Sequence, residues 1–181
     1  MKLTVPYYSQ YLDVEDKEWQ QRACGVACLK MLLESNRIKS PSIDEMIKDG
    51  VILGAYSENG WLHDGLIALG EKYGAKLYRK EFRKKDSSQD TLEKLNIEGV
   101  DMIVRELNEG RPVIISAIKN FYVRDKFHMV LVVGAEMEDV VVSGFYYHDP
   151  DSHTESKGAY QFVDINTFSS SWRRMAIFCK N

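Results

Sequence analysis

Cys24 lies where an irregular segment gives way to a predicted helix, which is a position that activates a thiol. The residues around it read QQRACGVACLKMLLE (20–34), and the apolar positions after the cysteine recur at helical spacing. The positive end of a helix dipole stabilises a thiolate and lowers its pKa. Much further along the chain, His128 opens an apolar segment and Asp149 follows another. A cysteine, a histidine and an acid can serve as nucleophile, general base and the residue that orients the base.

The segment that His128 opens and the segment that ends at His148 are predicted to be neighbouring strands, joined by a turn at residues 136–139. A turn centred there pairs His128 with Tyr147. Because side chains alternate across a sheet, His128, Tyr147 and Asp149 then share one face, and His148 points to the other. The Asp149 carboxylate is therefore expected to accept a hydrogen bond from the imidazole and to fix its tautomer.

Other residues of these types have simpler interpretations. Cysteines in apolar segments are usually buried packing residues, and a lone histidine on a helix or in a loop is usually structural or faces solvent. We assign such roles to Cys28, Cys179, His63 and His153. Asp151 is kept as an alternative to Asp149 as the orienting acid.

The elements that must position these residues follow an α+β order, with helices first and an antiparallel sheet second. Helices are predicted at residues 24–36, from Ser42, at 61–73 and at 100–108. Strands are predicted at residues 75–82, 113–118, 128–135, 140–148, 160–163 and 175–179. The chain of 181 residues is expected to form one domain, 1–181, because the candidate linker at residues 86–90 is too short to divide two domains.

Composition excludes several classes of protein. The chain is 44% hydrophobic and 28% charged with a formal net charge of −3, and it has no basic stripe with interleaved aromatics, so nucleic acid is not an expected partner. No apolar run approaches the roughly 20 residues that span a bilayer. The N-terminus lacks an apolar signal-peptide core, and three cysteines suit a reducing compartment, which predicts a cytoplasmic protein. Cys24 and Cys28 have no second ligand pair with zinc spacing elsewhere in the chain, and no metal or organic cofactor is expected.

Five short blocks occur in order along the chain: VPYYSQ (5–10), ACGVAC (23–28), GRPVI (110–114), HMVLVVG (128–134) and YHDP (147–150). Together they resemble the C39-like cysteine peptidases, which are relatives of the peptidase domain of bacteriocin-processing transporters within the papain-like clan. The resemblance covers residues 5–178. It implies a papain-like fold, in which an N-terminal helical half carries Cys24 and a C-terminal sheet carries His128 and Asp149.

The resemblance also implies a function, which is hydrolysis of a peptide or other amide bond through a thioester on Cys24. His128 would be the general base and Asp149 the orienting acid, and the substrate would be a peptide or protein. Substrate-binding roles are assigned to Gly25, Trp61 and Tyr147. Two alternatives keep the fold, namely an acyltransferase of the transglutaminase or ligase type and an inactive peptide-binding module. No sequence feature specifies an oligomeric state.

The glutamine that would stabilise the oxyanion is implied to be Gln10, which belongs to the tyrosine-rich first block. Many papain-like enzymes place this glutamine six residues before the cysteine, and that position here is Glu18. Gln20 and Gln21 are closer to Cys24 in sequence and are the alternatives. We favour Gln10 because it fits the motif.

Overall fold

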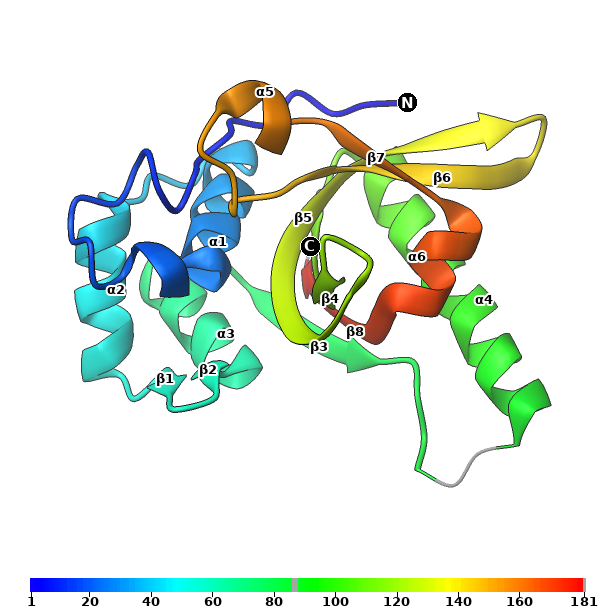
Figure 1. The fold of residues 1–181 in the computed structure, drawn as a ribbon, viewed down its shortest axis with the longest axis horizontal. Helices are drawn as coiled ribbons and strands as arrows, with labels where there is room; N and C mark the ends of the chain where they lie inside the picture. The colour runs from blue at the N-terminus through cyan, green and yellow to red at the C-terminus, as the bar shows by residue number, and fades with distance from the viewer. Residues whose placement is uncertain (86–87, 181) are drawn as a thin grey trace.

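The computed structural model describes residues 1–85 and 88–180, with the side chains of residues 124 and 125 outside that description. These residues form a central sheet with helices on both faces (Figure 1). Three helices cover one face: α1 (Cys24–Ser35), α2 (Ile43–Ile52) and α3 (His63–Lys72). The opposite face is covered by α4 (Gln89–Asn108) and α6 (Ile165–Ser171). Two short helices complete the set: η1 (Gln20–Arg22) and α5 (Glu155–Gly158). The predicted α+β class is confirmed.

The large sheet of the described chain has six strands in the order β3-β8-β4-β5-β6-β7, and every neighbouring pair is antiparallel. Its members are β3 (Leu77–Glu81), β4 (Val113–Lys119), β5 (Val123–Glu138), β6 (Val141–His148), β7 (Gln161–Asp164) and β8 (Trp172–Cys179). A separate small hairpin pairs β1 (Tyr56–Ser57) with β2 (Gly60–Trp61). None of the helices in the described ranges has the length and apolar character needed to cross a membrane.

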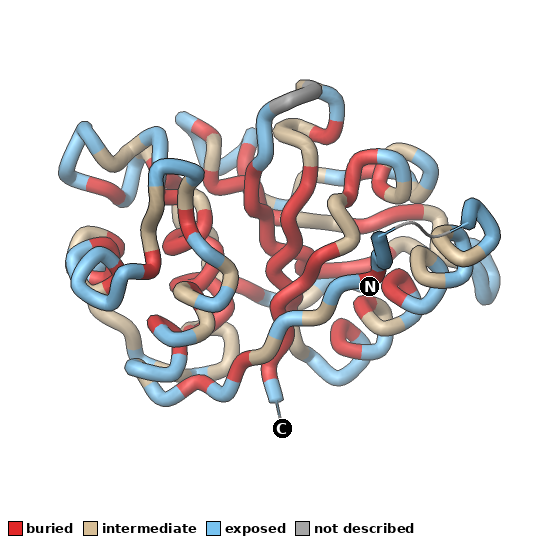
Figure 2. The backbone as a smooth tube through the Cα atoms, turned by 90° about the horizontal axis from the view of Figure 1, so that it is seen from below, coloured by how far each residue is buried: buried red, intermediate tan, exposed pale blue. Residues whose placement is uncertain are grey.

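The sheet separates two apolar cores. Met129, Leu131 and Val133 of β5 pack with α1, α2 and α3, whereas Val130 and Val132 pack with α4 and α6. This division follows directly from the alternation of side chains along a strand. Figure 2 shows the buried backbone concentrated in the strands through the middle of the molecule, with exposed segments around them. The sheet is thus a rigid support for residues at its margin.

Several helix boundaries follow local chemistry that the sequence shows. α1 begins at Cys24, as predicted, and α2 begins after Ser42, which forms a capping box with Glu45. Two boundaries were predicted wrongly. Trp61 belongs to β2 rather than to α3, and α4 begins at Gln89 rather than at residue 100, because its first turns are polar and largely exposed and so carry little apolar periodicity.

The structure also differs from the sequence-based predictions at residues 88–90 of the candidate linker 86–90 and at two short helices. Residues 86–87 lie outside the described residues, and Ser88 caps α4, whose first two residues are 89 and 90. Helices α5 and α6 were not predicted, because each is too short to show a helical period.

The predicted register between the strands carrying His128 and Tyr147 is wrong. β5 extends to Glu138, so the turn is shorter and lies further along the chain than residues 136–139. Two register shifts follow within the hairpin, and Tyr147 pairs with Val132 instead. His128 pairs on its other side with Ala117 of β4. The β5–β6 pairing ends at His148, which leaves the next residues free to bend away from the ladder.

The N-terminal segment fixes the loop that follows β6. The Leu3 N–H donates to the Val133 carbonyl at 2.8 Å, which anchors this segment on β5. The Tyr7 hydroxyl donates to the carbonyl of Asp149 at 2.8 Å, and the Gln10 N–H donates to the carbonyl of Pro150 at the same distance. The loop is therefore held by hydrogen bonds from a segment more than a hundred residues away in sequence.

Gly158 of α5 is essential to this arrangement, because a methyl group there would occupy the place of the Tyr7 hydroxyl. Its carbonyl also accepts from the Asp149 N–H at 2.8 Å. We expect Gly158→Ala to lower the free energy of unfolding by about 1–3 kcal/mol through overpacking. The neighbouring exposed Lys157→Ala should change it by no more than about 0.5 kcal/mol. Urea denaturation of both variants measures the difference, and equal stabilities would contradict this packing.

Candidate active site

The Cys24 thiol lies at the first residue of α1, close to His128 and to two backbone N–H groups. The side chain is partly exposed, and the backbone N–H groups of Gly25 and Met129 hydrogen-bond to its sulfur. Burial by itself raises the pKa of the thiol, but the charge and hydrogen bond of His128, together with these two backbone groups, outweigh it. The net pKa of Cys24 is therefore lower than normal, as a nucleophilic thiolate requires.

His128 lies between Cys24 and Asp149. Its Nε2 is 2.6 Å from Oδ1 of Asp149, so the carboxylate accepts the Nε2 proton and the other ring nitrogen faces the thiol. Burial favours the neutral ring, but the neighbouring Cys24 thiolate and the Asp149 hydrogen bond reverse this effect and raise the pKa of His128. The two shifts have opposite directions and a shared cause, which is the favourable pairing of a thiolate with an imidazolium.

Asp149 reaches His128 because β6 has already ended. Its Oδ1 also accepts the Asp151 N–H at 2.8 Å, which holds the carboxylate in position. The predicted contact between His128 and Asp149 thus exists, although the register used to predict it does not. His148 points elsewhere, with Nδ1 accepting the Tyr160 N–H at 3.0 Å.

The three candidate glutamines occupy different environments. Gln10 is buried and its Nε2 donates to Oδ1 of Asp151 at 3.2 Å, while its Oε1 has no hydrogen-bond partner among the described residues. Gln20 donates to two backbone carbonyls, at 3.1 and 2.9 Å. Gln21 is exposed and lines the cleft beside Cys24. Gln10 is therefore connected to Asp149 through Asp151, whereas Gln20 is occupied in holding its own loop.

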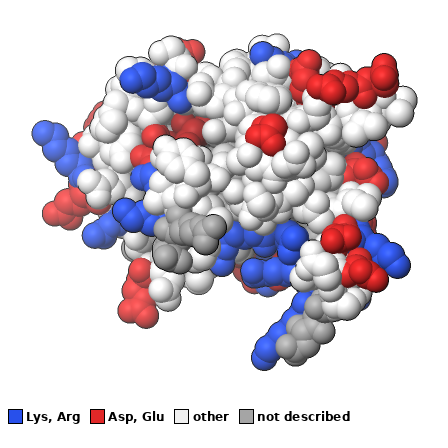
Figure 3. Space-filling view, turned by 45° about the vertical axis from the view of Figure 1, so that its right-hand side comes forward, with Lys and Arg blue, Asp and Glu red and all other residues white. Residues whose placement is uncertain are grey.

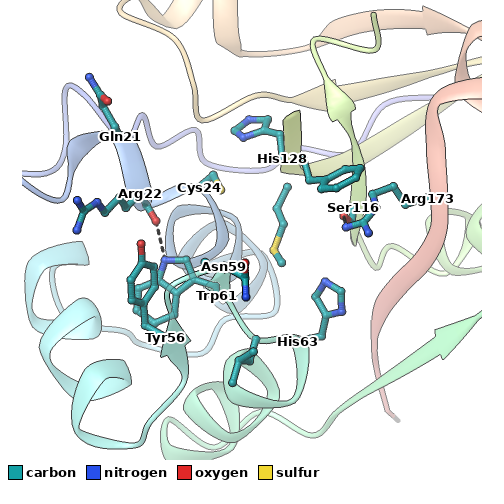
Figure 4. Close-up of a pocket in the computed structure, with 14 residues that line it drawn as sticks. Gln21, Arg22, Cys24, Tyr56, Asn59, Trp61, His63, Ser116, His128 and Arg173 are labelled. Carbon is teal, nitrogen blue, oxygen red and sulfur yellow. Dashed lines mark hydrogen bonds between the residues drawn. The ribbon is translucent and has the colours of Figure 1, made fainter. Parts of the chain in front are cut away.

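A cleft of about 340 Å³ opens at Cys24 and His128 (Figure 4). One wall is aromatic, with Trp61 donating from its indole nitrogen to the Arg22 carbonyl at 2.7 Å. Polar groups from the sheet lie toward the other end. The lining residues that come from outside the helical half are Ser116, Phe127, His128, Met129 and Arg173. The cleft therefore lies at the junction of the two halves.

The three residues assigned to substrate binding have different surroundings. Trp61 lines the cleft. Gly25 is buried, and a methyl group there would lie 3.0 Å from Leu66 and 3.2 Å from Trp61, so its small size permits close packing of α1 against its neighbours. Tyr147 borders a separate depression with Asp149 and packs edge-on against Phe121. Of the three, Trp61 has a side chain that lines the cleft, Gly25 contributes its backbone N–H to the thiol, and Tyr147 lies in the separate depression.

Sequence reasoning missed several residues of the site. Met129 follows His128 directly, so its N–H could have been anticipated at the thiol. Ser116 and Arg173 come from β4 and β8, and nothing in their sequence neighbourhood connects them to Cys24. Lys119, also on β4, forms an ion pair with Asp151. No group of three or more metal-ligating side chains occurs within the described part of the chain.

A helix that presents a cysteine at its N-terminus to a histidine on an antiparallel sheet is the architecture of the papain-like cysteine peptidases. The model of the Peptidase_C39 like family matches residues 2–177. The chain belongs to this family.

Solved structures show the same fold. A putative C39-like peptidase from Bacillus anthracis is 16% identical, with 100% of this chain and 98% of that chain covered and a TM-score of 0.68. A double glycine motif protease from an AMS/PCAT transporter, in complex with the leader peptide, is 17% identical, with 99% of this chain and 94% of that chain covered and a TM-score of 0.60. The peptidase domain of Streptococcus ComA, a bi-functional ABC transporter, is 19% identical, with 88% and 91% covered and a TM-score of 0.56. Comparison with curated protein sequences gives no match.

Because the pKa of Cys24 is lowered, we expect iodoacetamide to alkylate it rapidly at pH values below about 8.5, the pKa of an ordinary thiol. Only the thiolate reacts, so the rate should fall only when the pH drops through the lowered pKa. In His128→Ala the charge and hydrogen bond are lost and burial remains, so labelling should require a higher pH. Mass spectrometry locates the label.

Two other thiols serve as controls in the same molecule. Burial raises the pKa of Cys28 well above normal and that of Cys179 to about 11, so both should stay unlabelled at neutral pH. Equal pH profiles for Cys24 in the wild type and in His128→Ala would contradict an activated pair.

Proposed function

We propose that this chain is a cysteine peptidase that hydrolyses a peptide bond through a thioester on Cys24. The observation that carries the proposal is the 2.6 Å contact of His128 with Asp149 on the side of the ring opposite the Cys24 thiol. Membership of a peptidase family supports the same function. The cleft beside the thiol gives an extended peptide access to it.

The proposed reaction begins with attack of the Cys24 thiolate on the carbonyl carbon of the scissile bond. The His128 imidazolium donates its proton to the leaving amine as the tetrahedral intermediate collapses, which leaves a thioester and a neutral imidazole. His128 then accepts a proton from water, which attacks the thioester. Collapse of the second intermediate releases the acid product and regenerates the thiolate–imidazolium pair, while Asp149 keeps the ring oriented throughout.

Gln10 is proposed to stabilise the oxyanion together with a backbone N–H at Cys24. Its amide nitrogen carries two protons, and the carboxylate of Asp151 takes one of them at 3.2 Å. Asp151 is itself paired with Lys119, so the amide is held in a fixed orientation. The second proton remains for a developing negative charge. This network connects Gln10 with the loop that carries Asp149.

The proposed substrate is a peptide or a protein segment. The double glycine motif protease of similar fold is in complex with a leader peptide, which supports peptide recognition by this architecture. The aromatic wall of Trp61 and Tyr56, with ring centroids 5.1 Å apart, offers apolar contact area for such a segment.

We expect Cys24→Ser and His128→Ala to abolish cleavage of an internally quenched peptide library while leaving thermal unfolding unchanged. Asp149→Asn should reduce the cleavage rate by less than the roughly 100- to 10,000-fold that a positioned general base contributes, because the nucleophile and the base remain. Added nucleophilic amines, with products followed by mass, detect any transfer in place of hydrolysis. Retained cleavage in either of the first two variants, with normal folding, would overturn the proposal.

The role of Gln10 is tested by comparing alanine substitutions at all three glutamines. Gln10→Ala should lower kcat by about 100- to 1,000-fold, as expected for the loss of one oxyanion donor. Gln21→Ala should change kcat much less, and Gln20→Ala should mainly lower stability because its two backbone contacts are lost. A large fall in kcat for Gln21→Ala with near-normal Gln10→Ala would assign the oxyanion donor to Gln21.

A further inference from the structure

Apart from the Cys24–His128 pair, the charged residues that line the cleft are basic. They are Arg22 and Arg173, and no aspartate or glutamate occurs among the described residues that line the cleft. His63 also borders the cleft, but burial and the nearby Arg79 and Arg173 lower its pKa, so its ring is neutral at pH 7. The cleft therefore presents positive charge without a carboxylate of its own to neutralise it.

Arg173 is held in place without an acidic partner. Its guanidinium lies over the Phe127 ring, with Cζ 3.5 Å from the ring centroid. Its polar contact with the protein is a long one, from Nη1 to the Ser116 hydroxyl at 3.5 Å. A stacked guanidinium keeps its N–H groups at its edge, where they can bind a planar acceptor.

The carboxylates of Asp64 and Glu81 form ion pairs with arginines other than Arg173. Arg79 pairs with Asp64 at 2.8 Å and with Glu81 at 3.1 Å, and Arg83 pairs with the other oxygen of Glu81 at 3.1 Å. Within the described side chains, none forms an ion pair with Arg173. Lys and Arg side chains also gather along the lower middle of the face drawn in Figure 3. Arg173 thus has positive charge available for an external group.

Arg173 lies in the same cleft as the Cys24 thiol, so its charge is placed to contact a peptide bound there. In Figure 4, Arg173 and Ser116 lie on the sheet side of the cleft, whereas Trp61 and Tyr56 lie on the helical side, with Cys24 and His128 between the two groups at the rim. A peptide bound at Cys24 would contact an apolar wall on one side and an unpaired guanidinium on the other.

We propose that Arg173 forms a carboxylate-binding subsite, so that the preferred peptide carries a carboxylate near the scissile bond. This proposal rests on the proposed peptidase function and names its substrate class. The guanidinium fork matches a carboxylate in geometry and charge, and a charge-assisted pair of this kind in a partly buried site is stronger than a neutral hydrogen bond. The carboxylate comes either from an Asp or Glu side chain or from the C-terminus of a peptide.

The subsite is tested by binding, which does not require turnover. The Cys24→Ala protein is immobilised and exposed to a mixture of hexapeptides in which each position varies among Glu, Gln, Asp, Asn, Gly and Phe. One mixture has amidated C-termini and another has free C-termini, so the two sources of carboxylate are distinguished. Bound peptides are quantified by mass spectrometry.

We expect Glu over Gln, or free over amidated C-termini, to be enriched by about tenfold at one position, as suits a charge-assisted contact. Adding Arg173→Gln to the Cys24→Ala protein should remove this enrichment. The matched control adds Arg105→Gln, which changes an exposed arginine of α4, and should keep the enrichment. Adding Arg173→Glu instead should turn the preference toward Lys in a mixture that contains it. No enrichment of carboxylates, or the same enrichment with Arg173→Gln, would overturn the subsite.

Binding and cleavage measurements together show whether the subsite proposal or the peptidase proposal is wrong. If the wild-type protein cleaves peptides without any preference for carboxylates, the peptidase proposal stands and the subsite proposal fails. If the protein enriches carboxylates through Arg173 but cleaves no peptide, the subsite proposal stands and the protein is a peptide-binding module.

Discussion

The packing of the N-terminal turn of α1 against β5 is the constraint on which the site depends. It brings the thiol of Cys24 to the backbone N–H of Met129 and to the ring of His128. One turn further, the Cys28 thiol donates to the Met129 carbonyl at 3.4 Å, so successive turns of the helix contact the same strand residue. Gly25 permits this approach because a larger side chain would meet Met129 and Trp61. A small shift of α1 along β5 would separate the Cys24 thiol from the His128 ring.

The site also depends on electrostatic compensation inside a buried region. Burial opposes charge on both Cys24 and His128, and the opposite charge of the partner is the largest contribution that offsets this penalty in each group. Removal of either group therefore changes the protonation of its partner, and the pair titrates as a unit. Asp149 contributes a third fixed charge, and the loop that carries it is held by Tyr7 and by the N–H of Gln10.

The sequence determines the local chemistry of the site more clearly than its long-range geometry. The start of α1 at Cys24 and the Ser42 cap of α2 are local features, and both are found in the structure. The register between β5 and β6 depends on two bulges that leave no clear pattern in a single sequence, so His128 was paired with the wrong residue. Arg173 reaches the cleft only because β8 inserts between β3 and β4, which its own sequence does not indicate.

The charge state of His128 is the most direct test of the thiolate–imidazolium pair. Nuclear magnetic resonance of isotopically labelled histidine reports the protonation of the ring as a function of pH. We predict an imidazolium at pH 7 in the wild type and a lower pKa for His128 in Cys24→Ser, where the thiolate that raises it is absent. A neutral His128 ring at pH 7 in the wild type, or the same pKa in both proteins, would contradict the pairing.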